Sequence, residues 1–527
     1  MFSSRRSLLK FAAAAALPGV WRTSLAQTPP SDYPFPLGVA SGPGLPGGVV
    51  LWTRYAPGLA HSLESLAHLP FDQFKTRRAA PAAAGAVELQ WEVADDEGFT
   101  RVIRRGTARA TRELGHSVHV ELPDLPVGPW LFYRFRAGSA TSPVGRTRAA
   151  GPAERLRFAL ASCQHYETGH FGAYRHMLAD EPDFVLFVGD YIYEGGPRAD
   201  RWRPHPFPSC RTLADYRLRY SLYKSDPALQ AMHAHCPWLT VWDDHEVSND
   251  YARDRGENLE VDGRARRLAG YQAYYENMPL PVAVLAEPWQ HVRLWRSLGW
   301  GDLAHFTLLD GRQYRDPQAC PKPGRGGGST SEDLACPERR APQRSMLGAE
   351  QLRWLQSELA RPNAQWQFVV QQTLLSSLVR DNGVRRYWTD GWDGYPAERE
   401  RILAAIAASP APNTVVLGGD VHANWVCNVK RDFEQAESAV IATEFCGTSI
   451  SSESGWDAAK SARVKARNPH ALFGDSVTRG YLLGDLSRAK LSVRLRGIDD
   501  ARQLEPTAFD LARFEVLDGQ PGARRLA

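Results

Sequence analysis

The sequence predicts an α/β protein in which a layered domain with a central sheet follows a small all-β sandwich. Between Asp32 and about Arg148, polar and apolar residues alternate with a period of two, as they do in strands with one face in solvent. From Leu156 onward, short apolar runs stand at wide intervals with helix-like stretches between them, which is typical of strands buried on both faces. The chain of 527 residues is long enough for about two to four domains.

The all-β region is expected over residues 32–148. Its predicted strands are Val49–Arg54, Val87–Val93, Ser117–Leu122 and Trp130–Arg136. Short alternating strands with turn signals between them are typical of an immunoglobulin-like or fibronectin-like sandwich. An insert over about residues 57–84 is expected to be helical or irregular. Because this part of the sequence has no cluster of metal-ligating residue types, we expect it to have a packing role.

The layered domain is expected over residues 155–520. Its predicted strands are Arg157–Ala161, Asp183–Val188, Trp238–Trp242, Ala304–Leu309, Gln367–Val370 and Thr414–Leu417, and its predicted helices include Gly172–Ala179, Gly263–Tyr275 and Gly348–Leu359. Apolar strands that alternate with helices indicate a sheet covered by helices. The tail from about Ala462 adds a helical segment and the strands Gly480–Asp485, Lys490–Arg496 and Ala512–Leu517. It either extends the sheet or covers the site.

The first 27 residues have the features of an export signal. The paired arginines Arg5-Arg6 precede the apolar run Phe11–Val20, and Ser24-Leu25-Ala26 supplies the small residues of a cleavage site. This order is typical of a twin-arginine signal, which the export machinery reads and which is removed from the mature protein. We therefore expect a periplasmic or secreted protein. The alternative is an amphipathic N-terminal helix that stays on the chain.

Charge and hydropathy argue against two classes of partner. The formal net charge is +4 and no block of Lys and Arg stands out, so the charge gives no case for nucleic-acid binding. No apolar run reaches the roughly 18 residues that a membrane-spanning helix needs. The sequence leaves the oligomeric state open.

The sequence contains seven cysteines, which is consistent with export to an oxidising compartment where disulfides form. Cys320 and Cys336 flank the glycine-rich stretch Gly324–Gly328, which cannot pack by itself, so we expect a disulfide between them. The odd total leaves one cysteine unpaired if the other six form bridges. The sequence does not decide how the remaining cysteines pair.

Polar residues that can bind metal follow four of the predicted strands. They are Cys163 and His165 after the first strand, Asp190, Tyr193 and Glu194 after the second, Asp244, His245 and Asn249 after the third, and Asp420 and His422 after a later one. Open α/β sheets place their sites at the carboxyl ends of strands, so these side chains are expected to meet. A single Asp at a strand end is more often a helix cap or a turn residue, but four such ends indicate a site.

These residue types suit the hydrolysis of a phosphate ester. Two metal ions roughly 3.5–4 Å apart neutralise the phosphoryl oxygens and supply a nucleophile near neutral pH. The carboxylate of Asp190 has two oxygens and can bridge such a pair.

The other residues divide by chemistry into two groups. Cys163 and Tyr193 bind a metal only when they are ionised, which a ferric ion would bring about, and His422 would complete that position. The oxygens of Asn249 and Asp420 suit a hard cation such as calcium or manganese.

The order of these residues resembles that of the PhoD-type alkaline phosphatases and phosphodiesterases, a branch of the metallophosphoesterases. The matching words are Ala161-Ser162-Cys163-Gln164, Phe187-Val188-Gly189-Asp190-Tyr191-Ile192-Tyr193-Glu194, Asp244-His245-Glu246, Asn249, Leu309-Asp310-x-Arg312-Gln313-Tyr314-Arg315, Val370-Gln371-Gln372, Trp392-Asp393-Gly394-Tyr395-Pro396 and Gly418-Gly419-Asp420-Val421-His422. The opening Phe35-Pro36-Leu37-Gly38-Val39-Ala40-Ser41-Gly42 resembles the N-terminal sandwich of that family. The likeness covers nearly the whole mature chain.

The resemblance implies a four-layer αββα core. It also implies hydrolysis of phosphate monoesters, diesters or both by water or oxide that the metals activate. The implied ligands of Fe(3+) are Cys163, Asp190, Tyr193 and His422, and those of Ca(2+), which other divalent cations could replace, are Asp190, Asn249, Asp420 and Asp393. Asp190, Asp244 and His245 are the expected catalytic residues.

The chain departs from the general metallophosphoesterase pattern in its ligands. That pattern begins with Asp-x-His, where this sequence has Cys163-Gln164-His165, and it has a later His-x-His box, where this sequence has Asp420-Val421-His422. Nitrogen ligands are thus exchanged for oxygen and sulfur, which disfavours a standard di-zinc or di-manganese site.

Several roles stay open at this point. His245 either protonates the leaving oxygen or orients Asp244. Arg312 and Arg315 either clamp phosphate or form structural ion pairs. Asp393 is either a calcium ligand or a turn residue.

Two other functions fit parts of the sequence. The first is a phospholipase D-like phosphodiesterase on the same scaffold, which the sequence does not separate from a phosphatase because substrate choice lies in loops. The second is a non-catalytic exported calcium-binding protein. It does not explain why soft and hard ligands converge between Cys163 and His422.

Overall fold

A computed structural model describes residues 32–44, 47–60, 62–63, 85–287, 289–361, 364–380 and 384–527. The predicted export signal over residues 1–27 and most of the insert over residues 57–84 lie outside these ranges. Within them, no helix combines the length and the apolar character that a membrane span requires.

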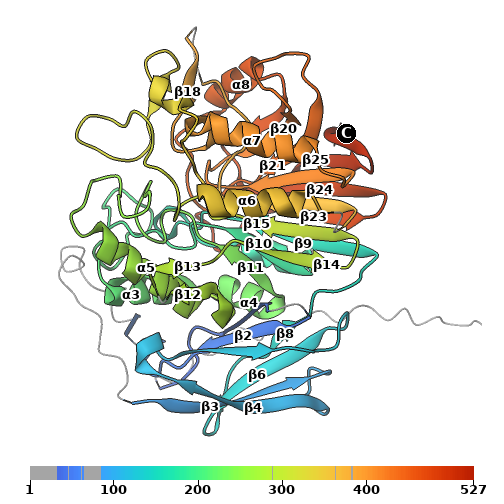
Figure 1. Ribbon diagram of the computed structural model, residues 1–527. Helices are drawn as coiled ribbons and strands as arrows, with labels where there is room; N and C mark the ends of the chain where they lie inside the picture. The colour runs from blue at the N-terminus through green and yellow to red at the C-terminus, as the bar shows by residue number, and fades with distance from the viewer. Residues whose placement is uncertain are drawn as a thin grey trace, which may run out of the picture.

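The N-terminal part is a sandwich of two antiparallel sheets (Figure 1). One sheet contains β1 (Val39–Pro43), β2 (Val49–Arg54) and β5 (Ser117–Leu122), and the other contains β4 (Val102–Ala110), β3 (Val87–Ala94), β6 (Leu131–Ala137) and β7 (Ala140–Thr141), with β8 (Gly145–Thr147) paired to β6. Their inner faces share one apolar core, to which Leu51, Leu89 and Phe135 belong. The predicted all-β region is confirmed.

Two seven-stranded sheets form the centre of the remaining chain. The first has the strand order β11 (Trp238–Val241), β10 (Phe184–Val188), β9 (Arg155–Ala161), β23 (Arg479–Ser487), β24 (Lys490–Ile498), β25 (Ala508–Leu517) and β26 (Gln520–Leu526). The second has the order β14 (Arg296–Trp300), β15 (Ala304–Leu308), β17 (Trp366–Val370), β19 (Asn413–Gly418), β21 (Val440–Cys446), β20 (Asn424–Lys430) and β22 (Ala471–Asp475). The three predicted strands of the C-terminal tail therefore extend the first sheet, while β22 joins the second.

The two sheets pack face to face through a dry aromatic cluster. The rings of Phe306 and Phe368 on the second sheet stack at a centroid distance of 4.5 Å, and Phe158 on the first sheet meets them edge to face at 5.7 and 5.5 Å. All three are fully buried. Burial at the interface explains why these strands are continuous apolar runs in the sequence.

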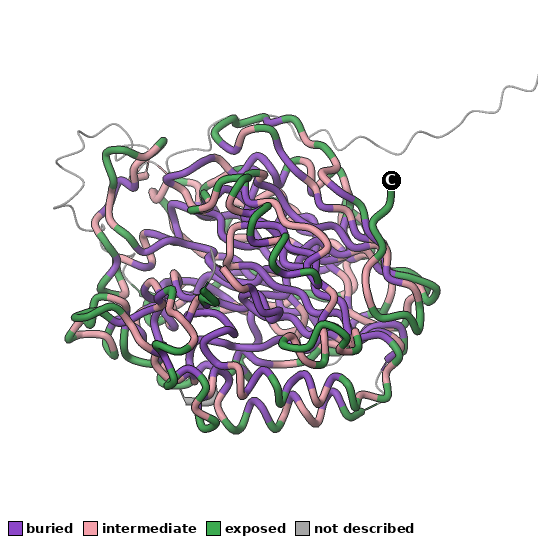
Figure 2. Tube along the Cα trace, turned by 90° about the horizontal axis from the view of Figure 1, so that it is seen from above, coloured by how far each residue is buried: buried purple, intermediate pink, exposed green. Residues whose placement is uncertain are grey.

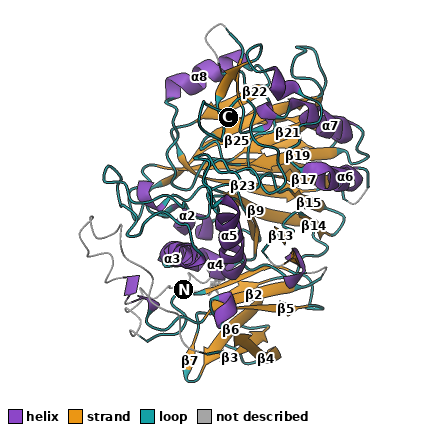
Figure 3. Ribbon diagram, turned by 60° about the vertical axis from the view of Figure 1, so that its left-hand side comes forward, coloured by secondary structure: helices purple, strands orange, loops and turns teal. Residues whose placement is uncertain are grey.

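Helices cover the outer face of each sheet (Figures 1 and 3). The first sheet carries α2 (Ala173–Ala179), α3 (Leu213–Lys224), α4 (Pro227–His235) and α5 (Gly263–Asn277), and the second carries α6 (Gly348–Leu359) and α7 (Pro396–Ala407). Figure 2 shows the buried interior that results. The predicted four-layer αββα core is confirmed.

Shorter elements join these layers. They are the strand pairs β12 (Leu285–Glu287) with β13 (His291–Val292) and β16 (Thr330–Glu332) with β18 (Arg386–Trp388), the helix α8 (Ala458–Arg467), and the 3-10 helices η2 (Arg112–Leu114), η3 (Tyr166–Thr168), η4 (Val282–Val284), η5 (Pro337–Arg340) and η6 (Trp392–Gly394). β16, β18 and α8 are the elements that matter below, because they border the functional site.

Local sequence explains where the helices begin. Thr212 and Asp215 form a reciprocal capping box at the start of α3. Asp226 accepts hydrogen bonds from the first turn of α4, which has Pro227 at a position where the missing N–H is not needed.

The predicted disulfide between Cys320 and Cys336 is present. The other five cysteines are unbridged and buried: Cys163, Cys210, Cys236, Cys427 and Cys446. Cys163 is thus available as a ligand.

Lys224, the last residue of α3, is buried where the sandwich meets the layered domain. Its Nζ lies 4.2 Å from the centroid of the Trp52 ring on β2 and 3.4 Å from Tyr191 Oη. Burial lowers the pKa of Lys224 from 10.5 to about 7. Between these two pH values the unfolded chain binds one proton more at this residue than the folded chain does. Lys224 therefore makes stability rise with pH across this window, and its destabilising effect is complete below pH 7.

We expect Lys224→Met to raise the melting temperature at pH 7 and to reduce the slope of stability against pH above pH 7 by up to about 1.4 kcal/mol per pH unit. Urea unfolding between pH 7 and 10 measures the slope. Lys322→Met replaces an exposed lysine and is the matched control. An unchanged slope in Lys224→Met would contradict the buried neutral lysine.

Candidate metal centre

Strand ends from both sheets meet at one place. Cys163 follows β9, Asp190 follows β10, and His422 follows β19 on the opposite sheet. The sulfur of Cys163, a carboxylate oxygen of Asp190 and an imidazole nitrogen of His422 all lie within 4.8 Å of one another. The carboxylates of Asp190 and Asp244 and a ring nitrogen of His245 do so as well. These side chains therefore meet as the sequence predicts, although up to 259 positions separate them along the chain.

The backbone at these positions is in the left-handed region. The φ angles are 57° at Cys163, 57° at Asp190, 63° at Asp420 and 51° at His422. Non-glycine residues rarely adopt this conformation, and such backbone strain clusters at functional sites. Gly189 allows the turn before Asp190, because a Cβ there would lie 2.4 Å from the Cβ of Asp243.

Tyr193 lies at the centre of the Cys163 side of the site. Its hydroxyl donates to Asp190 Oδ2 at 2.9 Å and lies 3.1 Å from His422 Nε2 and 2.6 Å from Ser452 Oγ. The rings of His165 and His245 flank the phenol, each at a centroid distance of 4.1 Å. His165 thus contacts a predicted ligand but lies outside the cluster formed by Cys163, Asp190 and His422.

The orientation of His422 suits a metal ligand. Its Nδ1 lies 2.9 Å from the carbonyl oxygen of Glu453. A carbonyl only accepts hydrogen bonds, so Nδ1 carries the proton and Nε2 presents a lone pair to the cluster.

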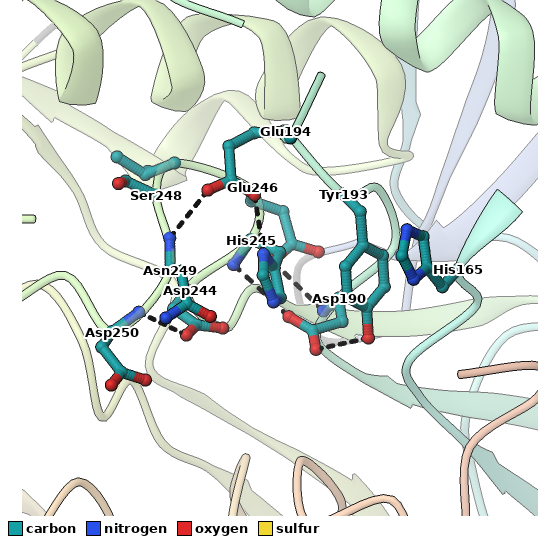
Figure 4. Close-up of polar contacts among 12 residues, drawn as sticks. His165, Asp190, Tyr193, Glu194, Asp244, His245, Glu246, Ser248, Asn249 and Asp250 are labelled. Atoms are coloured by element: carbon teal, nitrogen blue, oxygen red, sulfur yellow. Dashed lines mark hydrogen bonds and ion pairs between the residues drawn. The ribbon is translucent and has the colours of Figure 1, made fainter. Parts of the chain in front are cut away.

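Two buried glutamates hold the loops of the site (Figure 4). Glu246 accepts hydrogen bonds from the backbone N–H groups of Asp190, Tyr191 and Asp243. Glu194 accepts from the backbone of Asn249 at 2.8 Å and lies 2.6 Å from His245 Nδ1. The loops after β10 and β11 are therefore tied to each other by carboxylates.

Asn249 and Asp420 border the other side of the site. The amide nitrogen of Asn249 donates to Glu257 Oε2 at 2.9 Å, which leaves the amide oxygen as its free coordinating atom. Asp420 accepts from Thr373 Oγ1 through Oδ2 at 2.7 Å. Both residues line, with Asp190 and Asp244, a cavity of about 440 Å³. Cys163 and Tyr193 lie behind this cavity and are only 1% and 5% exposed.

Asp393 lines the same cavity, but its carboxylate is held by protein groups. Oδ1 lies 2.7 Å from Arg399 Nη1 and accepts from Ser377 Oγ at 2.7 Å, and Oδ2 accepts from the backbone of Leu378 at 3.0 Å. As a calcium ligand, Asp393 would have to exchange some of these partners for the ion.

Arg312 and Arg315 form structural ion pairs. They are 2% and 1% exposed, and both contact Asp390 Oδ1, at 3.0 and 3.2 Å. The Nε of Arg312 also donates to Asp243. Among the two roles left open by the sequence, these contacts favour the structural one.

The site gathers more negative charge than its protein cations balance. Burial raises the pKa of Asp420 to about 6, and burial and then Asp190 raise the pKa of Glu246 to about 8. Burial, followed by the Asp190 carboxylate, also raises the pKa of the Cys163 thiol and of the Tyr193 phenol well above their ordinary values. Bound cations reverse such shifts, because they favour the negatively charged form of the acids around them.

The carboxylates of the site affect His245 differently, because they favour its positively charged form. Burial alone would lower its pKa, but the carboxylates of Glu194, Asp244 and Asp190 raise the pKa of His245 well above 6.5. The neighbouring carboxylates thus favour the protonated imidazole beside the cavity.

Several residues of the site carried no predicted role. Ser452, which bridges Tyr193 and the carbonyl of Cys163, follows β21, a strand that was not among the predicted ones. The same rule of strand ends would have found it. Glu194 and Glu246 lie within the sequence motifs that match the family. Their contacts could not be predicted, because they depend on which loops meet in the folded protein.

Comparisons with known proteins agree with this geometry. The sequence profile of the PhoD-like phosphatases matches residues 158–495, and that of the N-terminal domain of PhoD-like phosphatases matches residues 21–151. Alkaline phosphatase D of Bacillus subtilis (strain 168) is 41% identical over 468 residues, which cover 86% of this chain and 75% of that protein.

Similar solved structures include PhoD and a purple acid phosphatase. A structure of PhoD superposes with a TM-score of 0.84 at 38% identity and covers 94% of this chain and 93% of its own. The purple acid phosphatase PPD1 from yellow lupin seeds superposes with a TM-score of 0.53 at 12% identity, over 91% of this chain and 74% of its own. The second likeness is one of fold.

Proposed function

Because the chain belongs to the PhoD-like phosphatase family, we propose that it is an exported, metal-dependent phosphoesterase that hydrolyses phosphate monoesters, diesters or both. The observation that carries the proposal is the meeting of Cys163, Asp190 and His422 within 4.8 Å at the edge of a cavity. In this proposal, residues 32–148 form the N-terminal domain and residues 155–520 the catalytic domain. The twin-arginine signal over residues 1–27 directs the protein to the periplasm or the exterior.

The donor groups fit two different cations. A thiol and a phenol that are buried and resist ionisation call for a strongly polarising ion, so we assign Fe(3+) to Cys163, Asp190, Tyr193 and His422. The remaining donors are oxygens, so we assign Ca(2+) to Asp190, Asn249 and Asp420. Asp393 joins them only if it gives up some of its present partners, such as Arg399.

When bound, the two ions would withdraw charge from the phosphoryl oxygens and lower the pKa of a water molecule. The chain's own residues supply the rest. Glu246 fixes the backbone of Asp190, Tyr191 and Asp243, so Asp190 is already placed between the two sets of donors. Ser452 bridges the Tyr193 hydroxyl and the Cys163 carbonyl and ties their two loops together.

His245 is assigned to protonate the leaving oxygen. Its Nδ1 faces Glu194, which leaves Nε2 as the nitrogen that can hold a proton toward the cavity. Glu194, which lies against Nδ1, favours the protonated ring, as a general acid requires. Asp244 holds charge beside it and accepts from the backbone of Asp250 at 2.6 Å.

The test is an assay of protein purified without chelator. Metal content is measured first, and then the hydrolysis of 4-nitrophenyl phosphate, bis(4-nitrophenyl) phosphate and a phosphatidylcholine. We expect turnover of at least one aryl ester that is lost on chelation and restored by ferric and calcium ions together. No turnover of either aryl ester by reloaded protein would contradict the proposal, and a preference for phosphatidylcholine would support the phospholipase alternative.

A further inference from the structure

The cavity beside the metal centre has a second wall of opposite character. One wall is acidic and includes Asp190, Asp244 and Asp420. The other wall is formed by Arg380, by Trp388 on β18, by Trp456 just before α8 and by Lys460 in the first turn of α8. The metal-binding function accounts for the acidic wall only.

The guanidinium of Arg380 packs on two aromatic rings and forms no ion pair with a carboxylate of the described residues. Its Cζ lies 5.3 Å from the centroid of the Trp388 ring and 4.8 Å from that of the Trp456 ring. Nε is buried and has no hydrogen-bond partner in the described ranges. Buried polar groups in native proteins normally have a partner, so the unpartnered Nε of Arg380 at a cavity wall calls for a ligand.

Lys460 places a second cation on the same wall. Its Nζ lies 4.6 Å from the centroid of the Trp456 ring, on which Arg380 also packs. No carboxylate of the described residues forms an ion pair with either head group. Burial and then the charge of Arg380 lower the pKa of Lys460. Two cations that repel each other across one indole ring are stabilised by an anion that both can reach.

The position of this pair distinguishes it from the groups that would hold the reacting phosphate. The reacting phosphoryl group belongs on the acidic wall, where the cations assigned above would hold it. A cavity of about 440 Å³ leaves room for more of the substrate than one phosphate. An anion on Arg380 and Lys460 would therefore be a second charged group of the same molecule.

We propose that Arg380 and Lys460, held by Trp388 and Trp456, form a subsite for a second phosphate group of the substrate. The preferred substrates are then phosphate esters that carry another phosphate beyond the scissile one. This inference rests on the proposed function, because it takes the acidic wall as the place of phosphate-ester hydrolysis.

The test uses two substrates that differ by one phosphate. They are thymidine 5′-(4-nitrophenyl phosphate) and the same compound with a phosphate on its 3′ hydroxyl, and both release 4-nitrophenol. The measured quantity is the selectivity, which is kcat/KM for the 3′-phosphorylated compound divided by kcat/KM for the plain compound. Because selectivity is a ratio within one protein, a partly unfolded variant does not distort it.

We expect wild-type protein to prefer the 3′-phosphorylated compound, and Arg380→Gln and Lys460→Gln each to lower the selectivity by about tenfold or more, as the loss of a hydrogen bond to a charged group would. Increasing salt should reduce the wild-type selectivity. Arg467→Gln changes an exposed arginine at the end of α8 and is the matched control.

Unaltered selectivity in both variants would overturn the subsite. If kcat/KM for both compounds also fell by the same factor in a folded variant, Arg380 would act on the scissile phosphate instead. Wild-type turnover of the plain compound separates this failure from a failure of the proposed function. If metal-reloaded wild-type protein hydrolyses neither compound, both the proposed function and the subsite that rests on it are contradicted.

Discussion

Replacing Asp190 with Asn is expected to abolish turnover while leaving the protein folded. Asp190 contacts Tyr193 through Oδ2 and belongs to two clusters of ligand-type atoms, one with Cys163 and His422 and the other with Asp244 and His245. In the proposal it is the carboxylate that the two ions share. An amide has one neutral oxygen to offer and cannot bridge them. The loss in kcat should exceed the about 10²–10³-fold cost of removing a single preorganised donor from an active site.

The same substitution should change stability in opposite directions with and without metal. In metal-free protein Asp190 repels neighbouring acids, since its charge raises the pKa values of Asp243 and Glu246 beyond the effect of burial. Asp190→Asn should therefore raise the melting temperature of metal-free protein. In metal-loaded protein it should lower the melting temperature, because binding to the folded state stabilises it.

Asp124→Asn is the matched control, since Asp124 is exposed in the N-terminal sandwich and has a positive φ that Asn tolerates. Its kcat and melting temperature should equal those of the wild type. Full activity in Asp190→Asn would remove Asp190 from the catalytic residues. A fall in the melting temperature of the metal-free variant would show that the carboxylate has a structural role instead.

Most of the catalytic core could be predicted because its strands are apolar on both faces. The segments β9, β10, β15, β17 and β19 lie within one or two residues of their predicted bounds. Their side chains are buried between the sheets or under helices, so the sequence at these positions has no polar face to obscure the pattern.

The helices α3 and α4 were not predicted, and packing explains why. α3 buries Arg219 and Lys224 together with Tyr216, Tyr220 and Tyr223, so its polar residues do not mark a solvent face. Arg219 reaches the carbonyl oxygens of Gly195 and Pro208, which are distant in sequence. A periodic pattern cannot reveal a helix whose buried face is charged.

The residues of the site also include some that the sequence predicts and some that it does not. The ligand-type residues follow strands directly, so local sequence motifs identify them. The residues that hold these ligands in place cannot be identified from local motifs, because Glu194 and Glu246 act across loops and Ser452 comes from the opposite sheet. The wall formed by Arg380, Trp388, Trp456 and Lys460 combines three separate segments. The spacing of these residues in the sequence does not predict this wall, because they come together only when the chain folds.

Replacing Cys163 with Ser is expected to remove iron from the protein. Cys163 Sγ is the only sulfur in the cluster with Asp190 and His422 among the described residues, and a serine hydroxyl does not ionise at neutral pH as a thiol beside a ferric ion does. The loss of iron affinity should exceed the about 10–100-fold that substitutions outside the ligand set typically cause. Elemental analysis measures the iron, and visible absorption reports any charge transfer from thiolate or phenolate to the metal.

Two comparisons make this result specific to Cys163. Cys236→Ser changes another buried, unbridged cysteine, at the end of α4, and should keep its iron and its colour. Tyr193→Phe removes the phenol that lies 2.9 Å from Asp190 and should lower both signals. The calcium content, which in the proposal depends on oxygens of Asn249 and Asp420, should fall less. If Cys163→Ser retains the iron of the wild type, the sulfur is not a ligand. The left-handed backbone at Cys163 would then serve only to turn the chain toward Ser452.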